Sequence, residues 1–199
     1  MTIIERISRD LNDPDHITWP VRDLQAWVKE AIGIAVTIAP EAFKRRKVVE
    51  VEPCTEYQEV PCCDFIFSVL GESTKDGRIT KRLRKATTWM GEWPQIGCTP
   101  SRSSGLKRYY ITGEKDLYLA PALPPGTTTY IVVECTSRDD VDPDNLPPNV
   151  DVAIIMWVLY RARSMDAESS VVGDMGERDY QKMKDLLSKF KGEIEDGQK

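Results

Sequence analysis

Few residues in this sequence have the types and spacing that catalysis or metal binding requires. His16, the single histidine, lies in the segment "DPDHITW", where a general-base role is possible but helix capping or packing is the commoner use. The acids of "DDVDPD" lack the glycine and the closing glutamate of a calcium-binding loop. No GxSxG, HExxH or phosphate-binding glycine motif occurs. We therefore expect no enzyme activity, no metal and no cofactor.

The five cysteines form no recognisable metal-binding or redox motif. Cys62 and Cys63 are adjacent rather than spaced as CxxC, and one histidine is too few to complete a zinc site with them. Such an irregular set is typical of reduced thiols in a protein made in the cytosol. We predict free thiols at Cys54, Cys62, Cys63, Cys98 and Cys135.

Two tryptophans and the overall charge bear on nucleic-acid binding. Trp89 and Trp93 could stack on a base or a sugar, but tryptophans beside glycine and proline more often form a small core under a loop. The net charge of -5 argues against general binding to duplex DNA, which usually requires a basic face. The first residues do not resemble a signal peptide, and no segment is long and apolar enough to span a bilayer, so we expect no membrane partner.

Charge is divided between two neighbouring segments. Residues 48–74 carry six acids and no Lys or Arg, a charge of -6, and residues 75–108 carry nine bases against two acids, a charge of +7. The two blocks could pair within one subunit, form a solvated face, or pair head-to-tail between identical copies. The basic block could also contact phosphates. The candidate interface with a further copy or with another protein comprises Lys81, Arg82, Arg84, Lys85, Glu56 and Glu59.

Helices are predicted at both ends of the chain. Thr2 and Glu5 fit a capping box that starts a short helix, and apolar residues recur every three or four positions from Pro20 to Pro40. Residues 151–166 contain nine consecutive residues without a charge or an amide, so this helix must be covered on more than one side. A last helix begins near Ala167. The expected bundle core contains Trp27, Val28, Ile32, Ile155, Trp157, Leu159 and Leu187.

Between these helices the pattern changes to the alternation typical of strands. "KVVEVE", "EYQEVP" and "DFIFSVLGE" read as short strands, "LKRYYITGEKDLYLAPAL" as a hairpin, and Thr127–Thr136 as a further strand. We therefore predict an α+β fold: a helical bundle formed by residues 1–46 and 148–195, with a β-rich insert at 47–147. Within that insert, residues 71–105 are expected to form an irregular loop.

The order of these segments resembles the head–tail adaptor (connector) proteins of tailed phages, especially short-tailed ones. "LNDPDHITWPVRDLQAWVKEAIGIAVTIAPEAF" is similar to the opening helices of that family. "RYYITGEKDLYLAPALPPGTTTYIVVECTSRDDVDPDNLP" is similar to its hairpin and following strand, and "VDVAIIMWVLYRARSMDAES" to its closing helices. "CTEYQEVP" occupies the place of its short strand pair. The resemblance covers nearly the whole chain, except for residues 71–105.

The resemblance implies a virion structural protein of the neck, assembled in the host cytoplasm. Its partners would be further copies of itself in a ring of twelve, the portal protein, and a tail tube or nozzle protein, with DNA only passing through the lumen. An alternative follows from the residues alone: a small regulatory or nucleic-acid-binding module that uses the basic block Arg78–Lys85 on phosphates.

Overall fold

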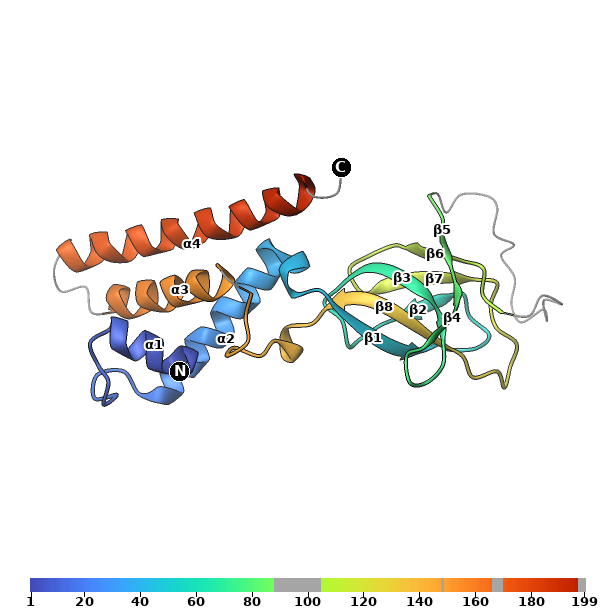
Figure 1. The fold of residues 1–199 in the computed structure, drawn as a ribbon, viewed down its shortest axis with the longest axis horizontal. Coiled ribbons are helices and arrows are strands. Elements are labelled where there is room, and N and C mark those ends of the chain that lie inside the picture. Colours follow the sequence, from blue (N-terminus) through green and yellow to red (C-terminus); the bar gives the residue numbers. More distant parts are fainter. Residues whose placement is uncertain (88–104, 148, 166–169, 197–199) are drawn as a thin grey trace. The chain divides into compact units, whose positions relative to one another are not determined.

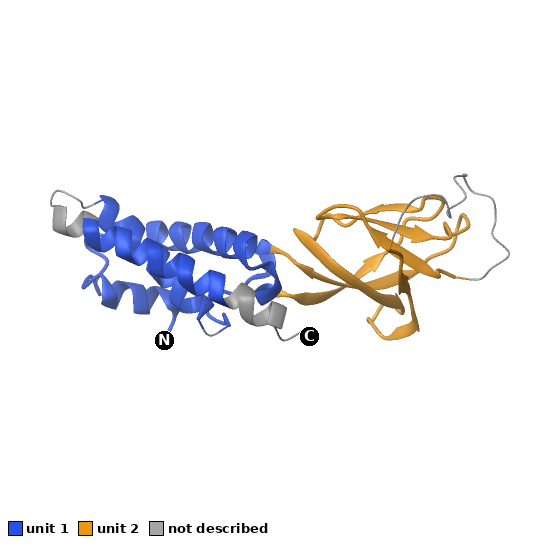
Figure 2. Cartoon of the chain, turned by 90° about the horizontal axis from the view of Figure 1, so that it is seen from above, with its two compact units in different colours: residues 1–43, 138–199 blue, residues 44–137 orange. Residues whose placement is uncertain are grey.

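The chain forms two compact units. The computed structural model describes residues 1–87, 105–147, 149–165 and 170–196. One unit combines Met1–Phe43 with Arg138–Lys199, and the other consists of Lys44–Ser137 (Figure 2). They are called the helical unit and the β unit below.

The helical unit begins with the capping box that the sequence predicts. The Thr2 hydroxyl accepts a hydrogen bond from the Glu5 backbone N–H (3.2 Å), and the Glu5 carboxylate accepts one from the Thr2 N–H (2.8 Å). The predicted helices are confirmed, with small shifts at their ends. Their bounds are α1 Ile3–Asp10, α2 Val21–Ile38, α3 Val150–Met165 and α4 Ser170–Asp196, with the short 3-10 helices η1 Pro40–Phe43 and η2 Arg138–Asp140.

Helix α3 is the helix that the others cover. It contacts α4, α2 and α1, and Figure 1 shows it running beside α4 with α1 on its other side. This arrangement explains why so few of its residues are polar, since a helix that packs on several sides cannot present a wide charged face to water. Its buried residues are Val150, Ala153, Ile154, Ile155, Val158, Leu159 and Ala162.

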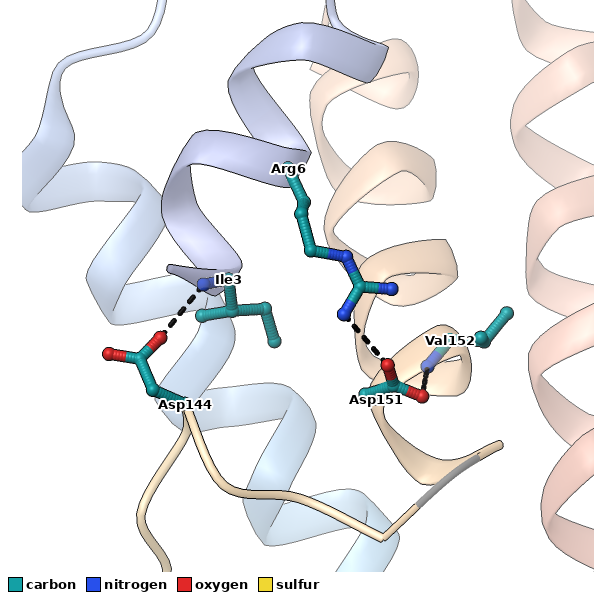
Figure 3. A network of polar contacts seen from close by, with 5 residues as sticks. All are labelled: Ile3, Arg6, Asp144, Asp151 and Val152. Atoms are coloured by element: carbon teal, nitrogen blue, oxygen red, sulfur yellow. Dashed lines mark hydrogen bonds and ion pairs between the residues drawn. The ribbon is translucent and has the colours of Figure 1, made fainter. Parts of the chain in front are cut away.

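Two carboxylates from late in the chain hold α1 in place (Figure 3). Asp144 accepts a hydrogen bond from the Ile3 N–H (2.8 Å), and Asp151 accepts one from the Arg6 guanidinium (2.7 Å). Asp151 also accepts a hydrogen bond from the Val152 N–H (2.7 Å) at the start of α3, where a negative charge stabilises a helix. The first helix is thereby fixed to residues more than one hundred positions further along the chain.

A third carboxylate organises the turn between α1 and α2. The buried Asp13 side chain accepts hydrogen bonds from the backbone N–H groups of Ile17 (2.9 Å), Thr18 (3.0 Å) and Trp19 (2.8 Å). The Trp19 N–H contributes most to lowering the pKa of Asp13 below its usual value. The ionised carboxylate therefore supplies the acceptors that the backbone of this turn requires.

The β unit consists of two four-stranded sheets. Sheet A has the strand order β1-β8-β3-β4 and sheet B the order β2-β7-β6-β5. Neighbouring strands are antiparallel, apart from the parallel pair β5 and β6. The strands are β1 Arg45–Glu50, β2 Tyr57–Glu59, β3 Phe65–Ser73, β4 Ile79–Arg82, β5 Arg84–Lys85, β6 Arg108–Ile111, β7 Asp116–Ala120 and β8 Tyr130–Thr136.

One hydrophobic core lies under both sheets. Val69 and Val133 come from sheet A, and Leu117 and Leu119 from sheet B, and all four belong to the same buried cluster. The alternating residues of two sheets that share a core must face each other, as in a sandwich. The β unit therefore buries its own apolar surface without needing a helix to cover it.

The predicted fold, a helical bundle carrying a β-rich insert, is wrong. The described residues form four α-helices and two four-stranded sheets, which is a mixed α+β fold. The sequence reasoning treated the middle segment as an insert because the predicted helices at the two ends of the chain had to pack on each other. It did not foresee that these strands divide between two sheets with a core of their own.

The expected irregular loop at residues 71–105 is also wrong over its first part. Residues 71–73 complete β3, and β4 and β5 follow; residues 88–104 lie outside the described residues. The β3–β4 pair requires a glycine, because a Cβ atom on Gly71 would lie 2.2 Å from the Lys81 carbonyl oxygen. All four residues of β4 are exposed, so no alternation of apolar and polar residues marks it in the sequence.

Candidate assembly surfaces

The candidate catalytic histidine, His16, takes part in a turn, and the described residues show no metal-binding cluster. His16 has a positive φ of 54° and its Nδ1 lies 3.2 Å from the Ser8 hydroxyl, at the turn that Asp13 organises. Within the described part of the chain, no group of three or more His, Cys, Asp or Glu side chains is placed to hold a metal ion. Among the described helices none is both long enough and apolar enough to cross a membrane.

The described cysteines form no disulfide. Cys63 and Cys135 are buried, Cys62 is exposed and Cys54 is half-buried. A hydrogen bond with Cys135, together with burial, raises the pKa of the Cys63 thiol far above its usual value, so this thiol stays protonated and unreactive. Cys98, Trp89 and Trp93 lie outside the described residues.

Four basic residues predicted as interface residues lie on one edge of the β unit. Strand β4 ends sheet A and β5 ends sheet B, and the single residue Leu83 joins the two strands. Leu83 is buried at the point where the chain passes from sheet A to sheet B, whereas the residues on both sides of it are exposed. The basic edge consists of Lys81, Arg82, Arg84 and Lys85.

Four acids lie on the opposite edge of the β unit. Strand β1 ends sheet A on that side and β2 ends sheet B, and the chain crosses between them through the buried residue Val51. Glu50, Glu52 and Glu59 are exposed, and Glu56 is half-buried. Desolvation raises the pKa of the Glu56 carboxyl above its usual value. The acidic edge consists of Glu50, Glu52, Glu56 and Glu59.

Some acids of the -6 segment are used inside the β unit instead. Glu72 accepts a hydrogen bond from the Leu106 N–H, beside the basic edge, and Lys81 donates one to the Leu106 carbonyl (2.5 Å). Asp64 lies 3.7 Å from the Lys115 ammonium. Within the described residues, by contrast, no ion pair involves a residue of the acidic edge or of the basic edge.

The surroundings of the acidic edge add further negative charge. Tyr57 donates a hydrogen bond to Asp116 (2.8 Å), and this bond is the main reason why the pKa of Tyr57 is raised. Asp116 is also the cross-strand partner of Glu59. Two like charges at paired positions disfavour each other, so this end of β2 and β7 would be stabilised by an incoming cation.

The helical unit has a broad groove beside α2. Its volume is about 1080 Å³, and Lys29, Arg138 and Asp139 contribute to its walls. Ile3 and Asp144, which are drawn in Figure 3, also line the groove. Exposed apolar patches of this kind mark sites of protein or membrane interaction, or ligand-binding grooves. The apolar part of the lining comprises Ile4, Ile34, Ile38, Val141 and Pro143.

Six of the seven residues expected in the bundle core are buried within the helical unit. Trp157 is only half-buried; its ring packs against Tyr160 (5.4 Å between centroids) and Tyr180 (5.9 Å). The Trp157 indole N–H is nevertheless enclosed and has no hydrogen-bond partner among the described residues. The six buried residues are Trp27, Val28, Ile32, Ile155, Leu159 and Leu187.

Sequence reasoning missed several residues that shape these surfaces. Glu50 and Glu52 were counted in the acidic block but not selected, although their alternation around Val51 indicates one exposed strand face. Leu83 was passed over because a single apolar residue among bases carries no periodic signal. The link between Asp144 and α1 joins distant positions, and no local pattern predicts it.

Comparisons with known proteins identify the family. The model of the family described as SU10 adaptor protein matches residues 2–198, which is nearly the whole chain. No curated protein matches the sequence. The family match confirms the resemblance to phage head–tail adaptors, and it indicates a structural component of the virion. The chain belongs to the SU10 adaptor protein family.

Proposed function

We propose that this protein forms a ring between the portal and the tail of a phage particle, with DNA passing through the lumen. The observation that carries the proposal is the family match over residues 2–198, because it takes in both units rather than one shared module. The ring would contain copies of this chain in the twelvefold number implied by the resemblance. Its neighbours would be a portal protein on one side and a tail component on the other.

The charge of the protein supports a passive role toward DNA. The net charge is -5, and the basic edge is a local feature of one unit. A lumen that is not strongly basic lets a polyanion pass without sticking, because phosphate affinity grows with each Lys or Arg that contacts the backbone. No catalytic step is part of this function.

Binding to the portal protein of the same phage tests the proposal. Purified protein is mixed with portal rings and analysed by size-exclusion chromatography with light scattering and by electron microscopy of the complexes. We expect a closed ring of this protein on one face of the portal. Absence of any complex with portal rings, under conditions in which both proteins are folded, would overturn the proposal.

The nucleic-acid-binding alternative is tested with the same protein. Fluorescence anisotropy with a duplex of about 30 base pairs is measured at 50 and 200 mM salt. The adaptor proposal expects weak binding or none. Tight binding by the monomer that weakens steeply with salt, combined with no portal complex, would favour a module that uses Arg78–Lys85 on phosphates.

A further inference from the structure

We infer that the acidic edge of one copy binds the basic edge of the next copy, so that the β units form a continuous belt in the assembled protein. This inference rests on the proposed ring function and adds the surface through which the copies meet. The acidic edge consists of Glu50, Glu52, Glu56 and Glu59, and the basic edge of Lys81, Arg82, Arg84 and Lys85.

The positions of the two edges prevent them from pairing within one copy. In sheet B, β2 and β5 are the first and last of four strands, so three inter-strand spacings separate them. Three spacings place the backbones of the two edge strands about 14 Å apart. Among the described residues no ion pair joins the two edges. The same holds for β1 and β4 in sheet A. Only a second molecule can bring the two edges together.

The two edges also match in construction. At each edge the chain crosses from sheet A to sheet B, with one buried aliphatic residue as an anchor: Val51 on the acidic side and Leu83 on the basic side. Each crossing presents four like charges that make no ion pair among the described residues. The two edges are therefore surfaces of similar length and opposite charge.

Protection of exposed strands is the simpler explanation that must be weighed against this inference. Charged side chains on edge strands prevent unwanted strand pairing, and like charges on both edges serve that purpose best, because two copies then repel. Sheet A partly follows this rule: β1 begins with Arg45 and Arg46, and β4 at its other edge is also basic. Sheet B does not, since its two edge strands carry opposite charges and would attract each other between copies. Protection alone does not explain opposite signs.

A contact between unlike edges has a geometric consequence. It is heterologous, because each copy uses one edge toward one neighbour and the other edge toward the next. Such contacts close into a ring when the rotation per copy divides the full circle, and otherwise continue as a filament. The contact that the edges allow is therefore the type that a ring requires, and not the type that makes an isolated dimer.

Zero-length cross-linking tests which residues meet. Equal amounts of unlabelled and ¹⁵N-labelled protein are assembled on portal rings and treated with a carbodiimide, which joins a carboxylate to a lysine amine only when the two are in contact. We expect cross-linked peptides that join Glu56 or Glu59 to Lys81 or Lys85. Mixed light–heavy peptides would identify each link as one between copies.

Charge reversal provides an independent readout of the same contact. Arg84→Glu combined with Lys85→Glu should weaken association between neighbours about tenfold, equivalent to about 1.4 kcal/mol per contact, and should do so most at low salt. Glu56→Lys combined with Glu59→Lys should weaken it similarly, and mixing the two double variants should restore assembly. Arg84→Glu alone is compared with Arg45→Glu as its matched control, because each reverses one exposed arginine of the β unit and Arg45 belongs to neither edge, so Arg45→Glu should leave ring yield unchanged.

The outcomes separate this inference from the proposed function. Normal rings on the portal without these cross-links, and without an effect of the reversals, would overturn the inference and leave the ring function intact. Absence of any association, in wild type as in variants, would overturn both. A circular dichroism spectrum and melting temperature like those of wild type must accompany each variant, and Arg82→Glu alone serves as a second test if the first pair fails to fold.

Discussion

The two units of this protein hold their charges in different ways. In the helical unit three carboxylates are fixed to the backbone or to another side chain: Asp13 binds three N–H groups, Asp144 caps α1, and Asp151 pairs with Arg6. In the β unit, the two edges carry eight charged residues that make no ion pair among the described residues. Charges of the first kind position a fold. Charges of the second kind, apart from Lys81, which binds the Leu106 carbonyl, remain available to a neighbouring molecule.

The largest expected effect tests whether the helical unit depends on α3. Ile154 is 1% exposed at the centre of that helix, so Ile154→Asp buries an unpaired carboxylate and should destabilise the helical unit by about 4 kcal/mol or more. Hydrogen exchange should show lost protection in α2–α4 and retained protection in β3 and β8. The matched control is Met165→Asp, at a position 61% exposed on the same helix, which should cost less than about 1 kcal/mol. Equal loss in both units would show that they unfold as one.

The second prediction concerns the β unit. Gly71→Ala places a methyl group against the Lys81 carbonyl oxygen, and we expect a loss of about 3 kcal/mol because backbone, unlike a side-chain tip, cannot move aside easily. Urea unfolding measures the loss of stability, and hydrogen exchange of the backbone amides in β3 and β4 shows that it lies in this part of the β unit. The β4 strand and its basic edge should be displaced, so ring yield should fall as well. Wild-type stability in this variant would contradict the close β3–β4 approach.

The third prediction uses acid to separate the two units. Asp13 and Glu134 both have a lowered pKa, Asp13 mainly through the Trp19 N–H and Glu134 mainly through the Ser68 hydroxyl, with Lys44 and Arg46 adding to the effect. A carboxylate whose folded pKa lies below its unfolded value, about 4, stabilises the fold above that pH, and the contribution disappears as the pH falls through the folded pKa. Both units should therefore lose stability below about pH 4.

Two variants and salt distinguish these carboxylates. Asp13→Asn should remove the acid dependence of the helical unit alone, and Glu134→Gln that of the β unit alone, as followed by thermal melts from pH 7 to pH 3. Added salt should weaken the Glu134 contribution, because Lys44 lies 3.3 Å and Arg46 3.7 Å from its carboxylate. It should affect Asp13 less, since the partners there are uncharged N–H groups. A salt effect equal in both units would contradict the assignment.

The smallest expected effect is a gain. Gly33 lies within α2, and a Cβ atom there would lie 4.0 Å from the Arg138 side chain, which is ordinary van der Waals contact. Gly33→Ala should therefore stabilise the helical unit by up to about 1 kcal/mol through helix propensity alone. Thermal unfolding checks this. A loss instead would show that the groove beside α2 needs the space that this glycine leaves.

The sequence predicted the elements with local signals. The Thr2–Glu5 capping box, the three- and four-residue spacing of α2, and the apolar run of α3 each lie within one helix, so propensity and periodicity describe them. The longer strands β3 and β8 were predicted for the same reason. Strands β4 and β5 were missed because their residues are all exposed, so Ile79–Lys85 shows no alternation of apolar and polar residues. Leu83 between the two strands is the one buried residue of this stretch.

The division into two sheets and the opposite placement of the edges could not be predicted in this way. The sum of charges in residues 48–74 and 75–108 is a property of the sequence, but its spatial meaning depends on strand order. Strand order is set by pairings such as β1 with β8, whose partners Arg45 and Cys135 lie far apart along the chain. No window of adjacent residues contains that information.

The bonds that Asp144 and Asp151 make to α1 have a consequence for how the chain folds during synthesis. The helical unit needs α3, and Val150 at the start of α3 comes 112 positions after Ile38 at the end of α2 (150 − 38). At a translation rate of 5–20 residues per second, the ribosome needs about 6–22 s to make that stretch. The last strand of the β unit ends at Thr136, so the β unit can fold once this residue has left the ribosome. At that time α3 and α4, against which α1 and α2 pack, have not yet emerged. The segment that is made first is thus the one that folds last.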